Sequence, residues 1–209
     1  MINHIIKICG IRDTETAEKT SQLGIDYIGL VFHPLSRRHV TIKQAISICK
    51  TIRKFNVLPV AVFVNHTAQE MQSICDATNI SIIQLHGHVA RAEHHLLPKA
   101  YQRIYVLNVN ETGELVSENE LVNLDPLRDM ILVDHHEPGL GKLINHTKLH
   151  YALTFPWLIA GGLTPHNVAD VIQQLKPSGV DVSTGVENFH QQKDIFLIQQ
   201  FVTAVREQS

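Results

Sequence analysis

Short apolar, β-branched runs alternate with amphipathic stretches along this chain of 209 residues, and this alternation constrains the fold more than any other feature. Several of the runs are apolar almost throughout, which is typical of parallel strands covered on both faces. The runs that we predict to be strands are Ile5–Cys9, Asp26–Phe32, Pro59–Val64, Ser81–His86, Arg103–Asn108, Met130–Asp134, Pro156–Ala160 and Gly179–Ser183.

Helical patterns fill the stretches between these runs. Apolar residues at 3.6-residue spacing predict two of the helices; they are Ile42, Ala45, Ile46, Cys49 and Ile52 in the first, and Met71, Ile74 and Cys75 in the second. Thr164 and Pro165 predict a helix start, with a capping hydroxyl followed by proline at the first helical position. We also expect a helix within Glu111–Asn123.

Strands that alternate with helices predict an α/β protein, either a closed barrel or a doubly wound open sheet. The number and even spacing of the strands favour the barrel. A glycine-rich dinucleotide fingerprint does not follow the first strand, which weakens the open-sheet alternative. The sequence therefore predicts a single (β/α)8 TIM barrel that spans residues 1–209.

Charge and hydropathy exclude several classes of partner. The formal net charge is −2 and the basic residues are scattered, so we expect no nucleic-acid partner. The longest apolar run, residues 156–163, is far shorter than the roughly 20 residues of a membrane span. The amino-terminal apolar stretch is too short for a signal peptide. Cys9, Cys49 and Cys75 have no paired spacing and fit reduced thiols. We expect a soluble, cytoplasmic protein without a membrane partner.

Polar residues end several predicted strands, and in such barrels the carboxyl ends of the strands carry the active site. Cys9 ends the first strand and Asp134 ends the sixth. A thiol and a carboxylate on one rim can act as general base and general acid. The alternatives are a buried core thiol and a carboxylate that caps a turn.

The last two strand-to-helix turns have the composition of a phosphate site. Gly161 and Gly162 precede the predicted helix start, and Ser183, Thr184 and Gly185 follow the eighth strand. Free backbone N–H groups near a helix start favour a bound dianion, and this fold recurrently binds phosphate after strands seven and eight. The alternative is that the glycines only permit a tight turn.

The histidines do not predict a metal site. The chain has 14 of them, but adjacent pairs such as His94-His95 and His135-His136 normally diverge, and neither a His-Glu-x-x-His nor a paired Cys-x-x-Cys spacing occurs. We therefore expect no metal site. His86 differs from the other histidines because it ends the fourth predicted strand.

Ordered motifs along nearly the whole chain resemble the phosphoribosylanthranilate isomerase family. They are Lys7-Ile8-Cys9-Gly10, Gly29-Leu30-Val31-Phe32 with Ser36, Arg38 and Val40, Val62-Phe63-Val64-Asn65, Gln84-Leu85-His86-Gly87, Ala160 to Val168, and Gly179 to Glu187. The loop that follows Asp134, residues 135–142, is shorter than the family usually has.

The resemblance implies an enzyme of tryptophan biosynthesis, an isomerase that rearranges N-(5-phosphoribosyl)anthranilate to 1-(2-carboxyphenylamino)-1-deoxyribulose 5-phosphate. It implies that Asp134 is the acid that opens the ribose ring and that Cys9 is the base at C2. This chemistry needs no metal and no organic cofactor. Arg38 would bind the anthranilate carboxylate, and Asp181 the sugar hydroxyls. Gln84 and His86 would also contact the substrate. We assign this role to Arg38 and not to Arg37, because the spacing of Arg38 from Ser36 and Val40 along the chain fits the motif.

Two rival functions remain open at this point. One is a different phosphate-binding barrel, such as a ribulose-phosphate epimerase, for which the metal-binding pattern is poor. The other is a phosphosugar-binding barrel without turnover, against which Cys9 and Asp134 argue. The only partner expected is a small phosphorylated substrate, and the chain could be a monomer or a homodimer.

Overall fold

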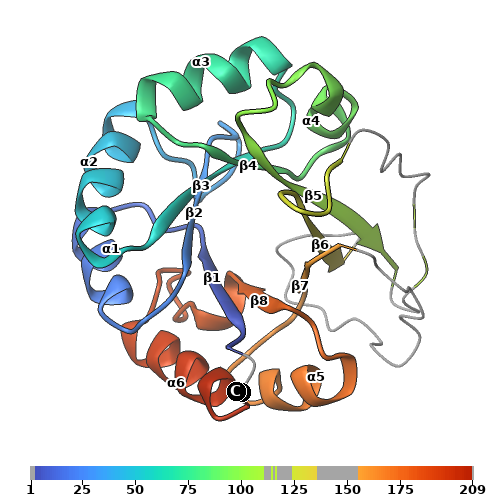
Figure 1. Ribbon diagram of the computed structural model, residues 1–209. Helices are drawn as coiled ribbons and strands as arrows, with labels where there is room; N and C mark the ends of the chain where they lie inside the picture. The colour runs from blue at the N-terminus through green and yellow to red at the C-terminus, as the bar shows by residue number, and fades with distance from the viewer. Residues whose placement is uncertain (1–2, 111–113, 115, 117–123, 136–154, 209) are drawn as a thin grey trace.

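Parallel strands form the centre of the computed structural model, which describes residues 3–110, 114, 116, 124–135 and 155–208. Within these residues the strands are β1 (Ile5–Cys9), β2 (Tyr27–Val31), β3 (Leu58–Phe63), β4 (Ile82–Leu85), β5 (Gln102–Val109), β6 (Met130–His135), β7 (Trp157–Ile159) and β8 (Gly179–Val182). Each strand pairs with the next in chain order, and β8 pairs with β1, so the sheet closes into a barrel (Figure 1). The predicted barrel is confirmed, and every predicted strand agrees with an observed one to within one residue at each end.

Helices surround the barrel as an outer layer (Figure 1). They are α1 (Thr14–Ser21), α2 (Ile42–Ile52), α3 (Ala68–Thr78), α4 (His88–Ala92), α5 (Val168–Leu175) and α6 (Ile195–Arg206), with 3-10 turns η1 (Arg53–Phe55), η2 (His94–Leu96) and η4 (Thr184–Val186). Local sequence sets several of their starts. Thr41 and Thr67 each begin a capping box, in which the threonine hydroxyl and the side chain three residues later satisfy each other's backbone N–H groups.

Alternation along the strands creates two apolar layers. Outward-facing residues such as Ile6, Ile8 and Ile28 pack under the helices, where the larger core lies. Inward-facing residues such as Val60 and Leu132 fill the barrel interior in a smaller cluster. Because both strand faces are buried, the strands read as continuous apolar runs, which is the pattern that predicted them.

Two helix predictions need correction. The buried stripe of α2 is Ala45, Ile48, Cys49 and Ile52, whereas Ile42 and Ile46 are more than two-fifths exposed. Thr164 is not the cap of α5, because that helix begins at Val168 after a turn over the intervening residues. The predicted helix within Glu111–Asn123 and the loop of residues 136–142 lie outside the described residues, apart from isolated positions 114 and 116.

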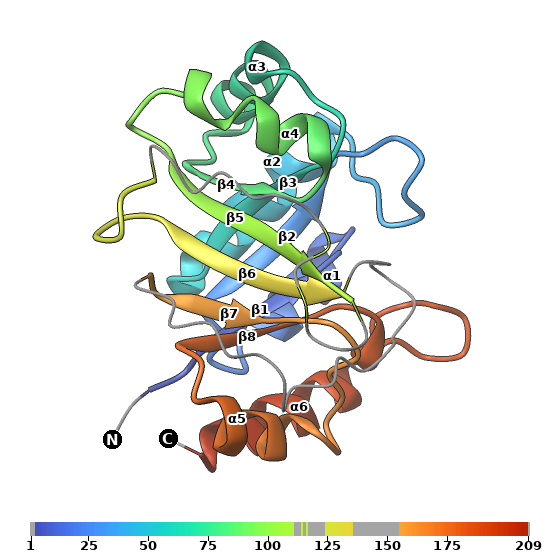
Figure 2. The same ribbon diagram turned by 90° about the vertical axis from the view of Figure 1, so that its right-hand side faces the viewer.

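All strands run in the same direction, so their carboxyl ends open onto one rim of the barrel (Figure 2). The segments that leave this rim include Gly10, the stretch from Phe32 to Val40, and the turns that follow β7 and β8. Side chains that point inward near these ends can meet, although they come from distant parts of the chain.

Candidate active site

Cys9 ends β1 and is one of the inward-facing residues at the rim, only 9% exposed. Burial raises the pKa of its thiol above the ordinary value. The positive charges of Lys7 and Lys193 act in the opposite direction, whereas the Asp181 carboxylate raises the pKa further. The predicted base therefore lies in a small cluster of charges and not in a purely apolar core.

Lys7 lies two residues before Cys9 on the same strand and is fully buried. Its ammonium forms an ion pair with Asp181, at 2.9 Å from Nζ to Oδ2. Burial disfavours the charged lysine, but Asp181, together with Cys9 when its thiol is ionised, outweighs that effect, so the pKa of Lys7 is raised. Oδ1 of Asp181 is buried and has no hydrogen-bond partner within the described residues. Asp181 thus binds a lysine through one oxygen, and its other oxygen has unused hydrogen-bonding capacity.

Asp134 faces His86 across the barrel mouth, with 3.8 Å between Oδ2 and Nε2. Both side chains are largely buried, at 11% and 17% exposure. Gln84 lies 3.2 Å from Nδ1 of His86 through its amide nitrogen. Burial lowers the pKa of His86 to about 4, with further contributions from the positive charges of Lys7 and Arg91. The imidazole is therefore neutral at pH 7. With Gln84 donating to Nδ1, the ring N–H is on Nε2 and is directed to the side of Asp134.

Asn108 is a polar residue of the rim that the sequence did not single out. It pairs in register with Asp134 across β5 and β6. Its Oδ1 atom is buried without a hydrogen-bond partner within the described residues, and the same is true of Oε1 of Gln84. Buried carbonyl oxygens without partners are uncommon and suit a site in which ligand groups complete the hydrogen bonding.

Arg38 lies beside Cys9, over Gly10, where a Cβ atom would come within 2.5 Å of the arginine Cδ. Its Nε and Nη2 atoms donate to both carboxylate oxygens of Glu187, at 2.6 and 2.8 Å. Lys193 also donates to Glu187, at 2.7 Å. Burial alone would raise the pKa of Glu187, but the hydrogen bonds from both cations hold it below the usual range. Nη1 of Arg38 makes no hydrogen bond within the described residues.

The turns after β7 and β8 form a second part of the rim. Gly161 and Gly162 adopt positive φ angles of 89° and 67°. Neither donates its backbone N–H to a hydrogen bond within the described part of the chain. The N–H of Thr164, by contrast, is bound to the Asn167 side chain at 2.7 Å. The two glycines therefore present free amides, which is the feature expected of a phosphate cradle.

Ser183 has a different orientation from the one expected of a phosphate ligand. Its hydroxyl donates to the backbone carbonyl of Cys9, at 3.1 Å, and receives a hydrogen bond from Lys193, at 3.2 Å. This residue ties the β8 turn to the end of β1. Thr184 and Gly185 follow in the η4 turn and are partly exposed.

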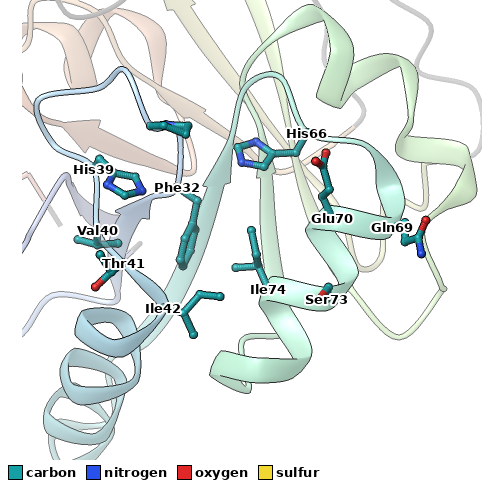
Figure 3. A pocket seen from close by; sticks show the side chains of 11 residues that line it. Phe32, His39, Val40, Thr41, Ile42, His66, Gln69, Glu70, Ser73 and Ile74 are labelled. Atoms are coloured by element: carbon teal, nitrogen blue, oxygen red, sulfur yellow. The ribbon is translucent and has the colours of Figure 1, made fainter.

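A separate hollow lies on the side of the barrel between the chain that leads into α2 and helix α3 (Figure 3). Its volume is about 530 Å³, and Phe32, His39, His66 and Ile74 are among its lining residues. None of the predicted site residues lines it. Phe32 stacks on Phe63, with ring centroids 5.5 Å apart, so this region continues the outer core. We assign it no part in the chemistry of the rim.

Sequence reasoning missed Lys7, Asn108, Glu187 and Lys193 as members of this rim. The sequence pattern could have identified Lys7, because side chains alternate between the two faces of a strand and Lys7 is two residues from Cys9. Both side chains therefore lie on the same face of β1. Asn108 ends its predicted strand, as Cys9 and Asp134 do. Within the described residues, no cluster of three or more histidine, cysteine or acidic side chains could hold a metal ion. None of the described helices has the length and apolar character needed to cross a membrane.

Known proteins similar to this chain match it over nearly its whole length. The family model of N-(5'phosphoribosyl)anthranilate (PRA) isomerase matches residues 6–204. An N-(5'-phosphoribosyl)anthranilate isomerase of Chlamydia felis is 35% identical over 96% of both chains.

Two solved structures have the same fold. One contains monomers made from the dimeric phosphoribosylanthranilate isomerase of Thermotoga maritima; it has a TM-score of 0.79 and 26% identity, and the match covers 98% of this chain and 99% of that one. The other is a phosphoribosyl anthranilate isomerase in complex with reduced 1-(o-carboxyphenylamino)-1-deoxyribulose 5-phosphate. Its TM-score is 0.74 and its identity 26%, with the same coverage.

Proposed function

This chain belongs to the N-(5′-phosphoribosyl)anthranilate isomerase family, and from that premise we propose how its own residues carry out the reaction. The protein is an isomerase of tryptophan biosynthesis. It converts N-(5-phosphoribosyl)anthranilate to 1-(2-carboxyphenylamino)-1-deoxyribulose 5-phosphate by an Amadori rearrangement. The observation that carries the proposal is the position of a thiol and a carboxyl group, Cys9 and Asp134, at the carboxyl ends of β1 and β6, on the same rim of the barrel.

Asp134 acts first, as general acid. Its carboxyl proton passes to the ribose ring oxygen, the bond between C1 and that oxygen breaks, and the lone pair of the anthranilate nitrogen forms the Schiff base. The near burial of Asp134 beside His86 supports this role, because bulk water has little access to the carboxyl group. His86 and Asn108 flank Asp134 and would hold the sugar and the acid in line.

Cys9 then acts as general base. Its thiolate takes the proton from C2, the C–H electron pair forms the bond between C1 and C2, and the π electrons of the Schiff base return to nitrogen. The resulting enolamine tautomerises to the ketone, which is the product. The requirement for a thiolate explains why cationic groups beside Cys9 matter, and the structure places Lys7 and Lys193 there.

Arg38, Gln84, His86 and Asp181 bind the substrate in this proposal. Nε and Nη2 of Arg38 remain bound to Glu187, and the anthranilate carboxylate accepts a hydrogen bond from the remaining Nη1 donor. The free Oδ1 of Asp181 and the free Oε1 of Gln84 accept hydrogen bonds from the sugar hydroxyls. The contacts to Asp181 and Gln84 each satisfy an oxygen that is otherwise buried without a partner in the described residues, which makes them selective for a hydroxylated ligand.

The phosphate binds between the turns after β7 and β8. The backbone amides of Gly161 and Gly162 are free donors with positive φ angles. The hydroxyl of Thr184 and the amide of Gly185 complete the cradle. Ser183 supports it by holding the β8 turn against Cys9. A dianion here is bound mainly by N–H dipoles, as at other phosphate sites of this fold.

We further propose that residues 1–209 form one barrel domain and that the protein acts in the cytoplasm, where its three free cysteines remain reduced. Every group assigned to the reaction comes from this one chain, so a monomer and a homodimer would each contain complete sites. Light scattering on the purified protein distinguishes these two states.

The experiment that tests the function supplies purified protein with freshly made phosphoribosylanthranilate and follows the loss of substrate fluorescence. Cys9→Ser should lower kcat by roughly 10²–10⁴, the usual contribution of a positioned base. Asp134→Asn should lower it at least as much, because an amide cannot supply the proton. Cys49→Ala removes a thiol buried under α2, outside the barrel interior, and serves as the control with near-normal turnover. Near-normal turnover by Cys9→Ser would reject the base assignment.

A further inference from the structure

A lysine with no exposed surface lies in the wall of the barrel, one of the largest fully buried side chains of the described chain. Moving an ammonium group out of water is strongly unfavourable unless charged and hydrogen-bonding partners compensate. Lys7 has one such partner, Asp181, its direct neighbour in the register of β1 and β8. A leucine or methionine of similar volume would fill this space without that penalty. The position therefore calls for an explanation beyond packing.

The pair of Lys7 and Asp181 is also incomplete as a structural ion pair. Only one carboxylate oxygen meets the ammonium, and the other is buried without a partner in the described residues. Buried ion pairs add stability only when their remaining hydrogen-bonding capacity is satisfied. This arrangement leaves the ammonium with donors to spare, directed into the barrel interior beside Cys9.

Gly29 shows how close the ammonium and the thiol lie. A Cβ atom on Gly29 would be 2.7 Å from Sγ of Cys9 and 3.1 Å from Nζ of Lys7. Both atoms thus occupy the space above the same glycine on the neighbouring strand β2, with no side chain from that residue between them. Any larger residue at this position would collide with the thiol and the ammonium.

We propose that Lys7 is a positioning residue for the base. Its buried ammonium, held in place by Asp181, supplies a positive charge that stabilises the thiolate of Cys9, and this thiolate accepts the proton from the substrate. This inference rests on the proposed function of Cys9 and adds a partner to it. Lys7 does not exchange a proton with substrate. It determines how much of Cys9 is in the reactive form before substrate arrives.

The other charges around Cys9 are balanced differently. Arg38 and Lys193 are the further cations that act on the thiol, and both share the carboxylate of Glu187. Asp181 is the anion that opposes the thiolate. Without Lys7, a new thiolate would face an uncompensated Asp181. With Lys7 present, its ammonium attracts both the Asp181 carboxylate and the Cys9 thiolate, so one cation offsets the repulsion between the two anions.

Two substitutions should move the titration of Cys9 in opposite directions. Lys7→Met keeps the volume and removes the cation, so the pKa of the thiol should rise by one unit or more, about a tenfold loss of thiolate at neutral pH. Asp181→Asn keeps the shape and removes the anion, so the pKa should fall. A purely structural role for Lys7 predicts that both variants loosen the site in the same way, without opposite signs.

The measurement is the rate of iodoacetamide alkylation of Cys9 as a function of pH in the protein without substrate, read by mass spectrometry of the Cys9 peptide. Cys9→Ser supplies the blank. Cys49 and Cys75 are internal controls, because burial raises their pKa values to about 11 and about 12. Opposite shifts in the two variants support the proposal, and shifts of the same sign, or none, overturn it.

If Lys7→Met alone does not fold, the double variant Lys7→Met/Asp181→Asn removes the unpaired charge and is compared with Asp181→Asn. Loss of Lys7 in that background should still raise the pKa of Cys9, and an unchanged value rejects the proposal. Turnover gives a second readout: kcat/KM of Lys7→Met should recover towards the wild-type value as pH rises. A Cys9→Ser enzyme that still turns over would reject the base itself, yet the alkylation result for Lys7 would stand separately.

Discussion

Individual side chains at the rim show how each charge is stabilised by specific neighbours. Arg38, Glu187 and Lys193 form one cluster, and Lys7 with Asp181 forms another. Because these groups are largely buried, their interactions are screened less than those of surface pairs. Substitutions here should therefore change binding or protonation by measurable amounts.

Arg38→Lys should not be conservative. Lysine keeps the charge but loses the planar fork that now holds both oxygens of Glu187, and it loses the third donor offered to the substrate carboxylate. The ratio of the wild-type and variant kcat/KM values should correspond to a loss of about 1–3 kcal/mol in binding free energy, the range of a hydrogen bond to a charged group. Arg37→Lys is the matched control, since Arg37 is directed to Gln191 at the surface and should be nearly silent. The reverse ranking in steady-state kinetics would show that the neighbouring arginine binds substrate.

His86 should make the free energy of unfolding depend on pH. Its pKa is lowered from 6.5 to about 4 in the folded protein, so only the unfolded chain binds a proton between these values. Stability is fully present above pH 6.5 and is lost as pH falls towards 4, by up to about 3 kcal/mol. Urea unfolding of wild type and His86→Gln across this range should show a smaller slope in the variant. His88→Gln, an exposed neighbour, should keep the wild-type slope.

At the scale of elements, the turns after β7 and β8 act as one unit. A Cβ atom on Gly185 would come within 1.8 Å of the backbone carbonyl of Leu163, so the two turns touch with no room for a side chain. The glycines after β7 have positive φ angles that other residues rarely adopt. Close contact and free amides are therefore properties of the pair of turns, not of either one.

Gly162→Asp should raise KM for the phosphorylated substrate at least tenfold with little change in kcat, because a carboxylate would stand where the dianion binds. Gly162→Asn is the matched control. Asparagine has the same shape and tolerates positive φ, so it imposes a similar backbone strain without the charge. A KM that is equal in the two variants would indicate that strain alone is responsible. A KM unchanged in both would move the phosphate to another part of the rim.

At the scale of the whole molecule, the two ends of the chain meet. β8 pairs with β1, and Arg206 at the end of α6 donates to Asn3, to the carbonyl of His4 and to the carbonyl of Gly24. The amino-terminal strands cannot complete their core without the last strand and helix. Closure thus makes the barrel depend on contacts that span almost the full sequence.

Urea unfolding should consequently be a single cooperative transition. Fluorescence of Trp157 on β7, the only tryptophan, and far-ultraviolet circular dichroism should give the same midpoint, since both report one core. Arg206→Ala should shift that midpoint to lower urea for both probes together, whereas Arg53→Ala, on the exposed η1 turn, should shift it less. Separate midpoints for the two probes would mean that the chain contains more than one folding unit.

The sequence by itself determined the strands, the barrel and the two residues proposed for acid–base chemistry. Burial of both faces of a parallel strand requires an apolar run, so eight such runs marked the strands to within one residue at each end. Strand ends marked Cys9 and Asp134, because parallel strands in a barrel bring their carboxyl ends to one rim. These features depend on local patterning, which the chain carries without reference to distant contacts.

Only the tertiary structure decided which charges surround these residues. Lys7 and Asp181 are 174 positions apart, and Arg38 and Glu187 are 149 apart, so neither pairing can be predicted from the period of a strand. They arise from the register between β1 and β8 and from the contact between turns at opposite ends of the chain. The protonation of Cys9 and His86 follows from burial and from these neighbours, which exist only after the barrel has closed.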